Sequence, residues 1–358
     1  MSVSRRQILR GSLAAGAVAM PFGVLAGPAH GAGAAGPVLA EDFYLALLDA
    51  NNQVVENYYT GHIHWQDAAH TKGTFGAPTS TFPTGGWDPL ECKFRKLASG
   101  EHVFMVCGGD SGNGRVTIHR SSDSAALGWD SGIPEFFPHS LEYVEKADVV
   151  IVVGTRGLDD KDKPPPQLPG GPKPRPGGSI QLYTAPTAQG GAGSFKKVPN
   201  GLYPFRQAHG VVRDQVNGGL VWVFGGDKIV GYTVDGFRET AKLREVARAR
   251  DQEHFENGHD LQPDPTYREY LWATGSRLLL KINKSGGRPR FEWGEPPAAA
   301  KSFSRHRSGR GIYTVDSEGN SYGTNKVEFL WPRATVTVPE IGNQKPKWIY
   351  KARLTDLP

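Results

Sequence analysis

Three histidines fall at matching points along the chain, each at the start of a short strand-like run. His139, His209 and His259 each precede a few mixed residues, a polar turn and a second, more apolar run. Lys301 takes the corresponding position in a fourth segment. A neutral imidazole can transfer a proton near neutral pH and several together can coordinate a transition metal, whereas an ammonium neutralises a carboxylate. These four residues are therefore the first candidates for chemistry.

The segments that carry these residues form a repeat. The step is 50 residues from His209 to His259 and 42 from His259 to Lys301. The longer step from His139 to His209 contains residues 158–178, a Pro-, Gly- and Lys-rich run that we interpret as a surface insertion. A period of roughly 40–50 residues with three or four strands per unit is typical of β-propeller blades.

We therefore predict an all-β fold, a single β-propeller over residues 35–358. Two further stretches, 91–120 and 42–59, resemble the repeat and bring the number of blades to six, with five or seven as alternatives. Residues 347–354 are expected to close the ring beside the N-terminal strand. Residues 238–250 have some helical periodicity, but an outer strand and a loop explain them equally well.

In a propeller the first strand of each blade lines the central channel, so the three histidines and Lys301 would meet at one mouth of it. His139, His209 and His259 could hold a divalent metal ion there or act as acid and base. Two other interpretations stay open. The polar residue that begins each inner strand can have a purely structural role, forming hydrogen bonds within the channel. Duplication of one ancestral blade would also repeat the same residue without any function.

The sequence argues against nucleotide and nucleic-acid partners. The Gly-rich run 108–114 follows a strand-like stretch but precedes no helix, so we expect a turn there and no nucleotide cofactor. Residues 1–34 contain three of the 41 basic residues and none of the 36 acidic ones, which leaves a net charge of only +2 on the rest. That small excess does not predict a nucleic-acid surface.

The first 34 residues have the features of an export signal. Arg5 and Arg6 precede a short apolar run rich in Gly and Ala, which is the pattern of a twin-arginine signal peptide. That run is too weak for a membrane span, and no other stretch is apolar enough. The sequence thus predicts a secreted protein without a membrane span.

An oxidising compartment would permit a disulfide between the two cysteines. If Ser99 and Gly100 form a two-residue hairpin turn, Cys92 and Cys107 face each other across the strands. A disulfide and two free thiols are equally compatible with the sequence.

The blade openings at His139, His209 and His259, together with the ending at 349–353, resemble a group of secreted bacterial propellers of unknown function. More distantly the chain is similar to propeller enzymes that act on carbohydrates, among them polysaccharide lyases and rhamnose–glucuronate-cleaving enzymes. The resemblance covers roughly residues 40–358. It implies an extracytoplasmic carbohydrate-active enzyme and an acidic glycan as partner.

The working hypothesis is a monomeric lyase that acts on a uronate-containing glycan by β-elimination. Lys301 or Arg206 would neutralise the carboxylate, His209 or His259 would remove the proton, and Tyr203 would protonate the leaving oxygen. Hydrolysis is a related alternative, although no pair of carboxylates stands out for it. A secreted propeller that binds a glycan or a protein without catalysis is the alternative from another class.

Overall fold

The computed structural model describes most of the chain beyond the predicted signal. The described residues are 41–110, 113–133, 137–155, 177–191, 193–250, 258–275, 278–293, 300–316 and 322–355. The predicted signal peptide and nearly all of the predicted insertion at 158–178 lie outside them.

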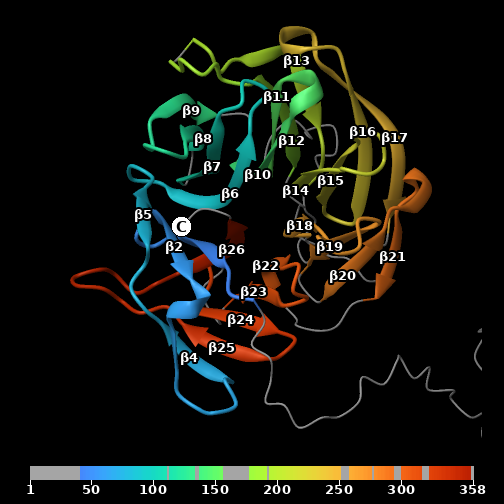
Figure 1. Cartoon of the computed structure of the whole chain (residues 1–358). Coiled ribbons are helices and arrows are strands. Elements are labelled where there is room, and N and C mark those ends of the chain that lie inside the picture. Colours follow the sequence, from blue (N-terminus) through green and yellow to red (C-terminus); the bar gives the residue numbers. More distant parts are fainter. Residues whose placement is uncertain are drawn as a thin grey trace, which may run out of the picture. The chain divides into compact units, whose positions relative to one another are not determined.

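Six sheets are arranged as blades around a common axis, so the prediction of a six-bladed β-propeller is confirmed (Figure 1). In order along the chain, the second to fifth blades each contain four consecutive strands. Blade 2 has β6 (Asp88–Lys96), β7 (His102–Asp110), β8 (Asn113–Arg120) and β9 (Ala126–Ile133); blade 3 has β10 (Phe137–Val144), β11 (Val149–Thr155), β12 (Gly178–Thr184) and β13 (Lys197–Pro204); blade 4 has β14 (Ala208–Arg213), β15 (Val221–Gly225), β16 (Lys228–Asp235) and β17 (Lys242–Arg250); blade 5 has β18 (Asp260–Pro263), β19 (Tyr270–Thr274), β20 (Leu279–Asn283) and β21 (Arg290–Trp293).

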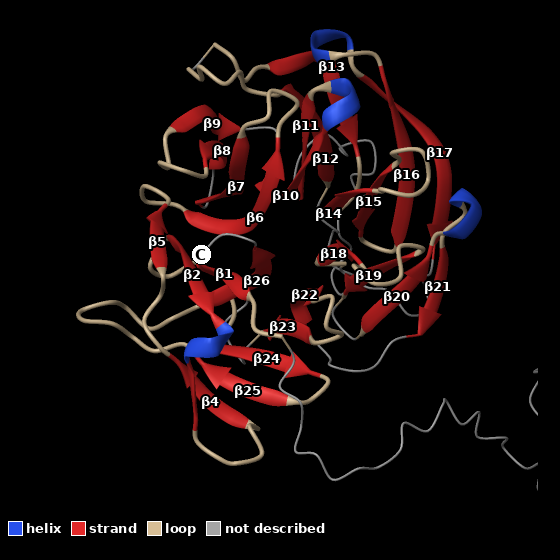
Figure 2. Ribbon diagram, viewed as in Figure 1, coloured by secondary structure: helices blue, strands red, loops and turns tan. Residues whose placement is uncertain are grey.

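Blades 1 and 6 depart from this pattern. Blade 1 contains β26 (Ile349–Thr355), β1 (Tyr44–Asp49), β2 (Val54–Tyr59) and β5 (Ser80–Pro83); blade 6 contains β22 (Ala300–Arg305), β23 (Gly311–Val315), β24 (Lys326–Leu330) and β25 (Ala334–Thr337), extended by β4 (Lys72–Phe75) and β3 (Ile63–Trp65). The only helices among the described residues are short 3₁₀ turns (Figure 2).

The ring closes where the two ends of the described chain pair. Strand β26 pairs antiparallel with β1, from Tyr44 opposite Thr355 to Asp49 opposite Ile349. This bears out the closing strand predicted at residues 347–354. The pairing satisfies the backbone of β1 on its inner side and makes β26 the innermost strand of blade 1.

Apolar side chains fill the six interfaces between neighbouring blades. Each interface has its own buried cluster, for example Met105 and Leu141 between blades 2 and 3, and Trp222 and Leu261 between blades 4 and 5. Successive side chains of a strand point to opposite faces, so each strand contributes to the interfaces on both of its sides. This packing explains why the second run of each repeat is apolar throughout.

Recurring aspartates hold the turns that follow several inner strands. Asp214 accepts hydrogen bonds from the indole Nε1 of Trp222 and from Nζ of Lys284, both at 2.8 Å. Asp264 accepts one from Nε1 of Trp272, also at 2.8 Å. The tryptophans therefore both pack between blades and anchor the turn of their own blade.

The predicted pairing of the cysteines is wrong. In the β6–β7 hairpin Cys92 lies opposite Val106 and Glu91 lies opposite Cys107, because the turn is longer than the predicted Ser99–Gly100 pair. A shift of one residue moves a side chain to the other face of the sheet. Cys92 accordingly packs between blades 1 and 2 and Cys107 between blades 2 and 3, and both are free, buried thiols.

Candidate functional site at one end of the axis

Six residues share one position in the inner strands, and we call them the axial ring: Leu90, His139, His209, His259, Lys301 and Tyr350. In five blades this residue is skipped in the pairing of the inner strand with its neighbour, as where Ala208 lies opposite Gly225 but Gly210 lies opposite Phe224. In blade 5 the corresponding residue, His259, immediately precedes the inner strand β18.

The unpaired residue is a β-bulge, and a bulge turns a side chain away from the alternation of its strand. This local irregularity brings the predicted histidines together. The ring centroids of His139 and His209 are 4.2 Å apart, and those of His209 and His259 are 5.3 Å apart. Lys301 Nζ lies 3.4 Å from His259 Nε2. The four residues selected from the sequence thus form one continuous cluster drawn from four successive blades.

Hydrogen bonds determine which ring nitrogens remain available. In His209, Nδ1 lies 2.9 Å from the backbone oxygen of Gln207, so it carries the proton in the neutral ring. Nε2 of His209 then has the lone pair, and no hydrogen bond to it is found among the described residues. In His139 both ring nitrogens have partners, Thr155 Oγ1 at 3.0 Å and the Tyr350 hydroxyl at 3.4 Å.

Burial keeps the three imidazoles neutral. His139 and His209 are each 8% exposed, and burial lowers the pKa of His209 to about 4. Burial, with His209 as neighbour, lowers the pKa of His139 well below its usual value. Burial and the Lys301 ammonium do the same to the pKa of His259. A neutral imidazole can accept a proton or bind a metal through a ring nitrogen that has no other partner. Which role is possible therefore depends on which ring nitrogens are free and on what they face.

Those lone pairs do not fit a metal held by the three histidines. His139 is engaged through both nitrogens, and Nε2 of His259 faces the Lys301 ammonium, which would repel a cation. Within the residues that the structure describes, no three His, Cys, Asp or Glu side chains group as metal ligands would.

Lys301 is held by an acid as well as by His259. Its Nζ lies 3.1 Å from Oδ2 of Asp316, and burial raises the pKa of that carboxyl. The ammonium is 7% exposed, so its charge is only weakly screened by water. Lys301 is thus positioned to attract a ligand carboxylate at the axial ring.

Below the axial ring a layer of ion pairs fills the axis. Arg353 donates to Glu91 and Asp260, with distances of 2.5–2.8 Å, and Lys351 Nζ lies 3.3 Å from Glu91 Oε2. All four side chains are almost fully buried. Burial disfavours the charge of Glu91, but Arg353 and Lys351 outweigh that and hold its pKa well below the usual range. This layer places buried, paired charges next to the histidines, because Glu91, Asp260 and Lys351 each directly follow a residue of the axial ring.

A different, basic environment lies beyond this layer. Arg95 pairs with Glu142 at 2.6 Å and Arg305 with Asp264 at 2.8 Å. A cavity of about 250 Å³ is lined by both arginines together with Lys93 and Arg353. The histidines of the axial ring do not contribute to this cavity.

Two residues of the predicted site lie apart from the cluster. Tyr203 is in β13, the outermost strand of blade 3, and its hydroxyl accepts a hydrogen bond from the backbone of Leu243. The structure therefore corrects the expectation that Tyr203 acts beside His209: the two are close in sequence, but they stand at opposite edges of neighbouring blades. Arg206 lies on the turn that leads into β14, outside the axial ring, and is half-buried.

Tyr350 is the member of the cluster that the sequence analysis missed. Its strand was expected to close the ring, but its opening residue was not aligned with the histidines of the other blades. The bulge between Leu48 and Asp49 in the β1–β26 pairing reveals the equivalence. Burial raises the pKa of the Tyr350 hydroxyl, so it stays protonated.

The hairpin that contains His62 and His64 also lies away from the axis. His64 is in β3, which pairs with β4 beyond the outer strand of blade 6. Both histidines are exposed there. They are therefore not part of the candidate site.

Among the described residues, no helix is long and apolar enough to cross a membrane.

Comparison with known proteins supports the fold and no specific activity. No family model and no curated protein matches the chain. A solved structure of a functionally unknown protein from Desulfotomaculum acetoxidans DSM 771 is similar, with a TM-score of 0.50 and 8% identity over 87% of this chain and 84% of that one. Dihydro-haem d1 dehydrogenase NirN is also similar, with a TM-score of 0.38 and 13% identity over 87% of this chain and 54% of that one. The first of these is similar in fold along most of both chains, and this chain is a β-propeller.

Proposed function

We propose that the chain is an extracytoplasmic carbohydrate-active propeller that binds a uronate-containing glycan at the axial ring and cleaves it by β-elimination. The observation that carries the proposal is the fixed tautomer of His209. Its Nδ1–H donates a hydrogen bond to the Gln207 carbonyl oxygen, and no hydrogen bond to its Nε2 lone pair is found among the described residues. The neutral ring with a free lone pair is the form that a general base requires.

The reaction balances with three side chains. The Lys301 ammonium would bind the uronate carboxylate, which acidifies the adjacent C–H. His209 Nε2 would take that proton while the electrons form a carbon–carbon double bond and the bond to the leaving oxygen breaks. Tyr350 would replace Tyr203 as the donor of a proton to that oxygen, because its hydroxyl belongs to the ring and is protonated.

A second candidate function is binding without catalysis. It is favoured by the low exposure of His139 and His209 and by the hydrogen bonds that already engage His139 on both sides. In that case the same cation would hold an acidic sugar or a protein carboxylate, and the histidines would serve the structure of the axis.

The test is to incubate the purified protein with a panel of acidic glycans and to follow the ultraviolet absorbance of an unsaturated uronate. The variant is His209→Gln, which removes the base but keeps a polar side chain of similar size. His64→Gln, at the exposed β3, is the matched control. Calorimetric titration with the same glycans reports binding separately from turnover.

Activity that is lost in His209→Gln and kept in His64→Gln would support the lyase. Binding without any product, weakened by Lys301→Met, would support the non-catalytic candidate. If neither product nor binding is found with any acidic glycan, both forms of the proposal are rejected.

The same proposal includes export by the twin-arginine route. Arg5 and Arg6 are its basis, and they lie outside the described residues. Replacing both with Lys should retain the protein in the cytoplasm of an expression host that has this pathway, whereas unchanged export would reject the assignment.

A further inference from the structure

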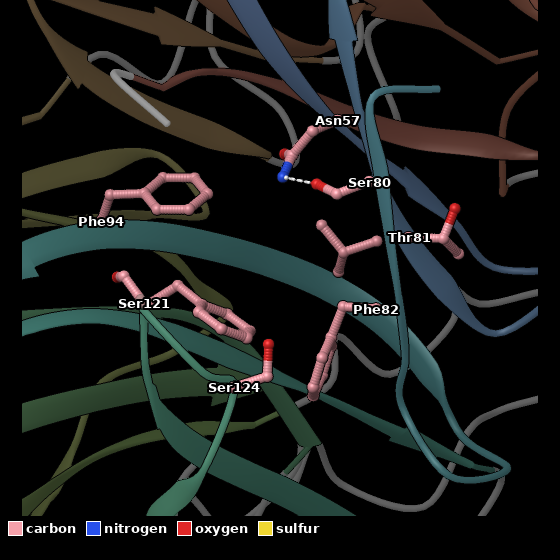
Figure 3. Close-up of a pocket in the computed structure, with 9 residues that line it drawn as sticks. Asn57, Ser80, Thr81, Phe82, Phe94, Ser121 and Ser124 are labelled. Atoms are coloured by element: carbon pink, nitrogen blue, oxygen red, sulfur yellow. Dashed lines mark hydrogen bonds between the residues drawn. The ribbon is translucent and has the colours of Figure 1, made fainter. Parts of the chain in front are cut away.

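A cavity of about 350 Å³ lies between blades 1 and 2, away from the axial ring (Figure 3). Its lining comes from β2, β5, β6, β7 and the turn that follows β8. The volume is at the lower end of the roughly 300–1,000 Å³ of ordinary small-molecule sites. Because two blades contribute, the cavity is a feature of the assembled ring.

Three phenylalanine rings form the apolar part of this cavity. Phe82 and Phe104 pack edge to face with centroids 4.7 Å apart, and Phe94 lies 6.3 Å from Phe104. Figure 3 shows Phe94 and Phe82 on opposite sides of the cavity. Such rings offer flat apolar faces to a ligand that has an apolar face of its own.

The polar part of the cavity has one group with an unmet hydrogen bond. Asn57 Nδ2 donates to Ser80 Oγ at 2.8 Å, whereas Asn57 Oδ1 is buried and has no partner among the described residues. A buried acceptor without a donor costs about 1–3 kcal/mol in a folded protein. If the Asn57 side chain turns so that this oxygen faces the cavity, an O–H group of a ligand that donates to it recovers that cost.

The lining is uncharged, which sets the class of ligand. None of the side chains that line the cavity is ionisable; the polar ones are Asn57 and the hydroxyls of Ser80, Thr81, Ser121 and Ser124. His119 stacks behind Phe104 at 5.1 Å, and burial lowers its pKa. A charged ligand would lose its hydration here without a counter-ion, which is costly.

We propose that this cavity is a second binding site and takes a neutral saccharide. A sugar ring would place its apolar face on the phenylalanines and donate a hydroxyl to Asn57 Oδ1, while the surrounding serine and threonine hydroxyls exchange hydrogen bonds with its rim. The site does not depend on the chemistry of the axial ring, so either assignment can fail without the other.

The test is titration of the purified protein with methyl glycosides of glucose, galactose and mannose, followed by saturation-transfer NMR and calorimetry. Asn57→Leu removes the acceptor but keeps the shape of the side chain, and Phe94→Ala removes one half-buried ring. Phe237→Ala, at an exposed phenylalanine in the turn before the outer strand of blade 4, is the matched control. Thermal melting confirms that each variant is folded.

We expect at least one methyl glycoside to bind, with the affinity reduced tenfold or more in Asn57→Leu and in Phe94→Ala and unchanged in Phe237→Ala. Benzyl alcohol serves as an apolar probe. If it binds and the glycosides do not, or if Asn57→Leu leaves the glycoside affinity unchanged, the saccharide assignment is overturned. Glycoside binding that is lost in His209→Gln but kept in Asn57→Leu would place the sugar at the axial ring and likewise overturn it.

Discussion

The ammonium of Lys301 lies 3.4 Å from Nε2 of His259, although the two residues come from neighbouring blades and are 42 positions apart. A cation this close opposes protonation of the imidazole, in addition to the effect of burial. Replacing Lys301 with Met should therefore raise the pKa of His259. Titration of the imidazole NMR signals would measure it, with Lys281→Met, on the outer part of blade 5, as the control. An unchanged pKa would mean that burial alone neutralises the ring.

The lowered pKa of His209 predicts a loss of stability in mild acid. His209 has a pKa near 6.5 in the unfolded chain and of about 4 in the folded protein. Below pH 6.5 the unfolded chain therefore binds more protons than the folded protein, and acid shifts the equilibrium toward unfolding. Between about pH 7 and pH 5, His209 alone should lower the free energy of unfolding by about 2 kcal/mol. Urea unfolding at the two pH values measures this change.

The variant His209→Gln should remove that part of the pH dependence. The ion-paired carboxylates of the axis do not interfere, because a carboxylate with a lowered pKa loses its contribution only below its unfolded pKa of about 4.5. An equal acid sensitivity in His209→Gln would show that other groups are responsible.

Removing Glu91 should be strongly destabilising. Its carboxylate holds Arg353 and Lys351 in the middle of the fold, and removing one partner of a buried ion pair typically costs about 3–5 kcal/mol. Denaturant unfolding of Glu91→Ala would measure this, and Glu239→Ala, an exposed site, should change stability by about 0.5 kcal/mol or less. A double Glu91→Met/Arg353→Met variant should recover part of the loss, and no recovery would contradict this account.

The two turn aspartates should differ in the cost of their loss. Asp214 pairs with Lys284, which is 2% exposed, whereas Asp264 pairs with Arg305, which is 18% exposed and can turn toward water. Asp214→Asn should therefore cost about 3 kcal/mol or more and Asp264→Asn about 1–2 kcal/mol. Both variants lose a charged acceptor for a tryptophan indole. The difference between their losses of stability therefore measures the cost of leaving the Lys284 ammonium buried without its partner. Equal losses would contradict the argument.

The two thiols should be unreactive in the folded protein. Both cysteines are buried, and burial raises the pKa of each thiol, so almost no thiolate is present near neutral pH. We expect no reaction with a thiol reagent under native conditions, two reactive thiols after unfolding, and no effect of reductant on the melting temperature. No reactive thiol after unfolding, or a melting temperature lowered by reductant, would indicate a disulfide.

The sequence was sufficient to predict much of this structure because its signals repeat. A strand, a turn and an apolar strand recur at similar spacing, and the histidines could be aligned by that pattern. Details that depend on register were less accessible. Cys92 and Cys107 were mispaired because the length of one turn decided the register, and Tyr203 was misplaced because closeness in sequence does not show on which strand of a blade a residue lies.

Tyr350 illustrates a third kind of limit. Nothing in its own segment marks it as equivalent to the histidines, because the equivalence comes from a bulge formed with a strand about 300 residues earlier. The ion pairs of the axis were inaccessible for the same reason. Glu91, Asp260 and Arg353 belong to three different blades, so their contacts depend on the arrangement of the whole ring.

The closing strand has a consequence for how the protein is made. Glu91 and Asp260 are supplied by blades 2 and 5, but both cations that neutralise them, Lys351 and Arg353, are on β26. Without this strand Glu91 and Asp260 lose the ion pairs with Lys351 and Arg353, and only Lys93 of blade 2 still lowers the pKa of Glu91. Completion of the ring and neutralisation of its centre are thus a single step of folding, which couples the stability of blades 2 and 5 to the strand that closes the ring.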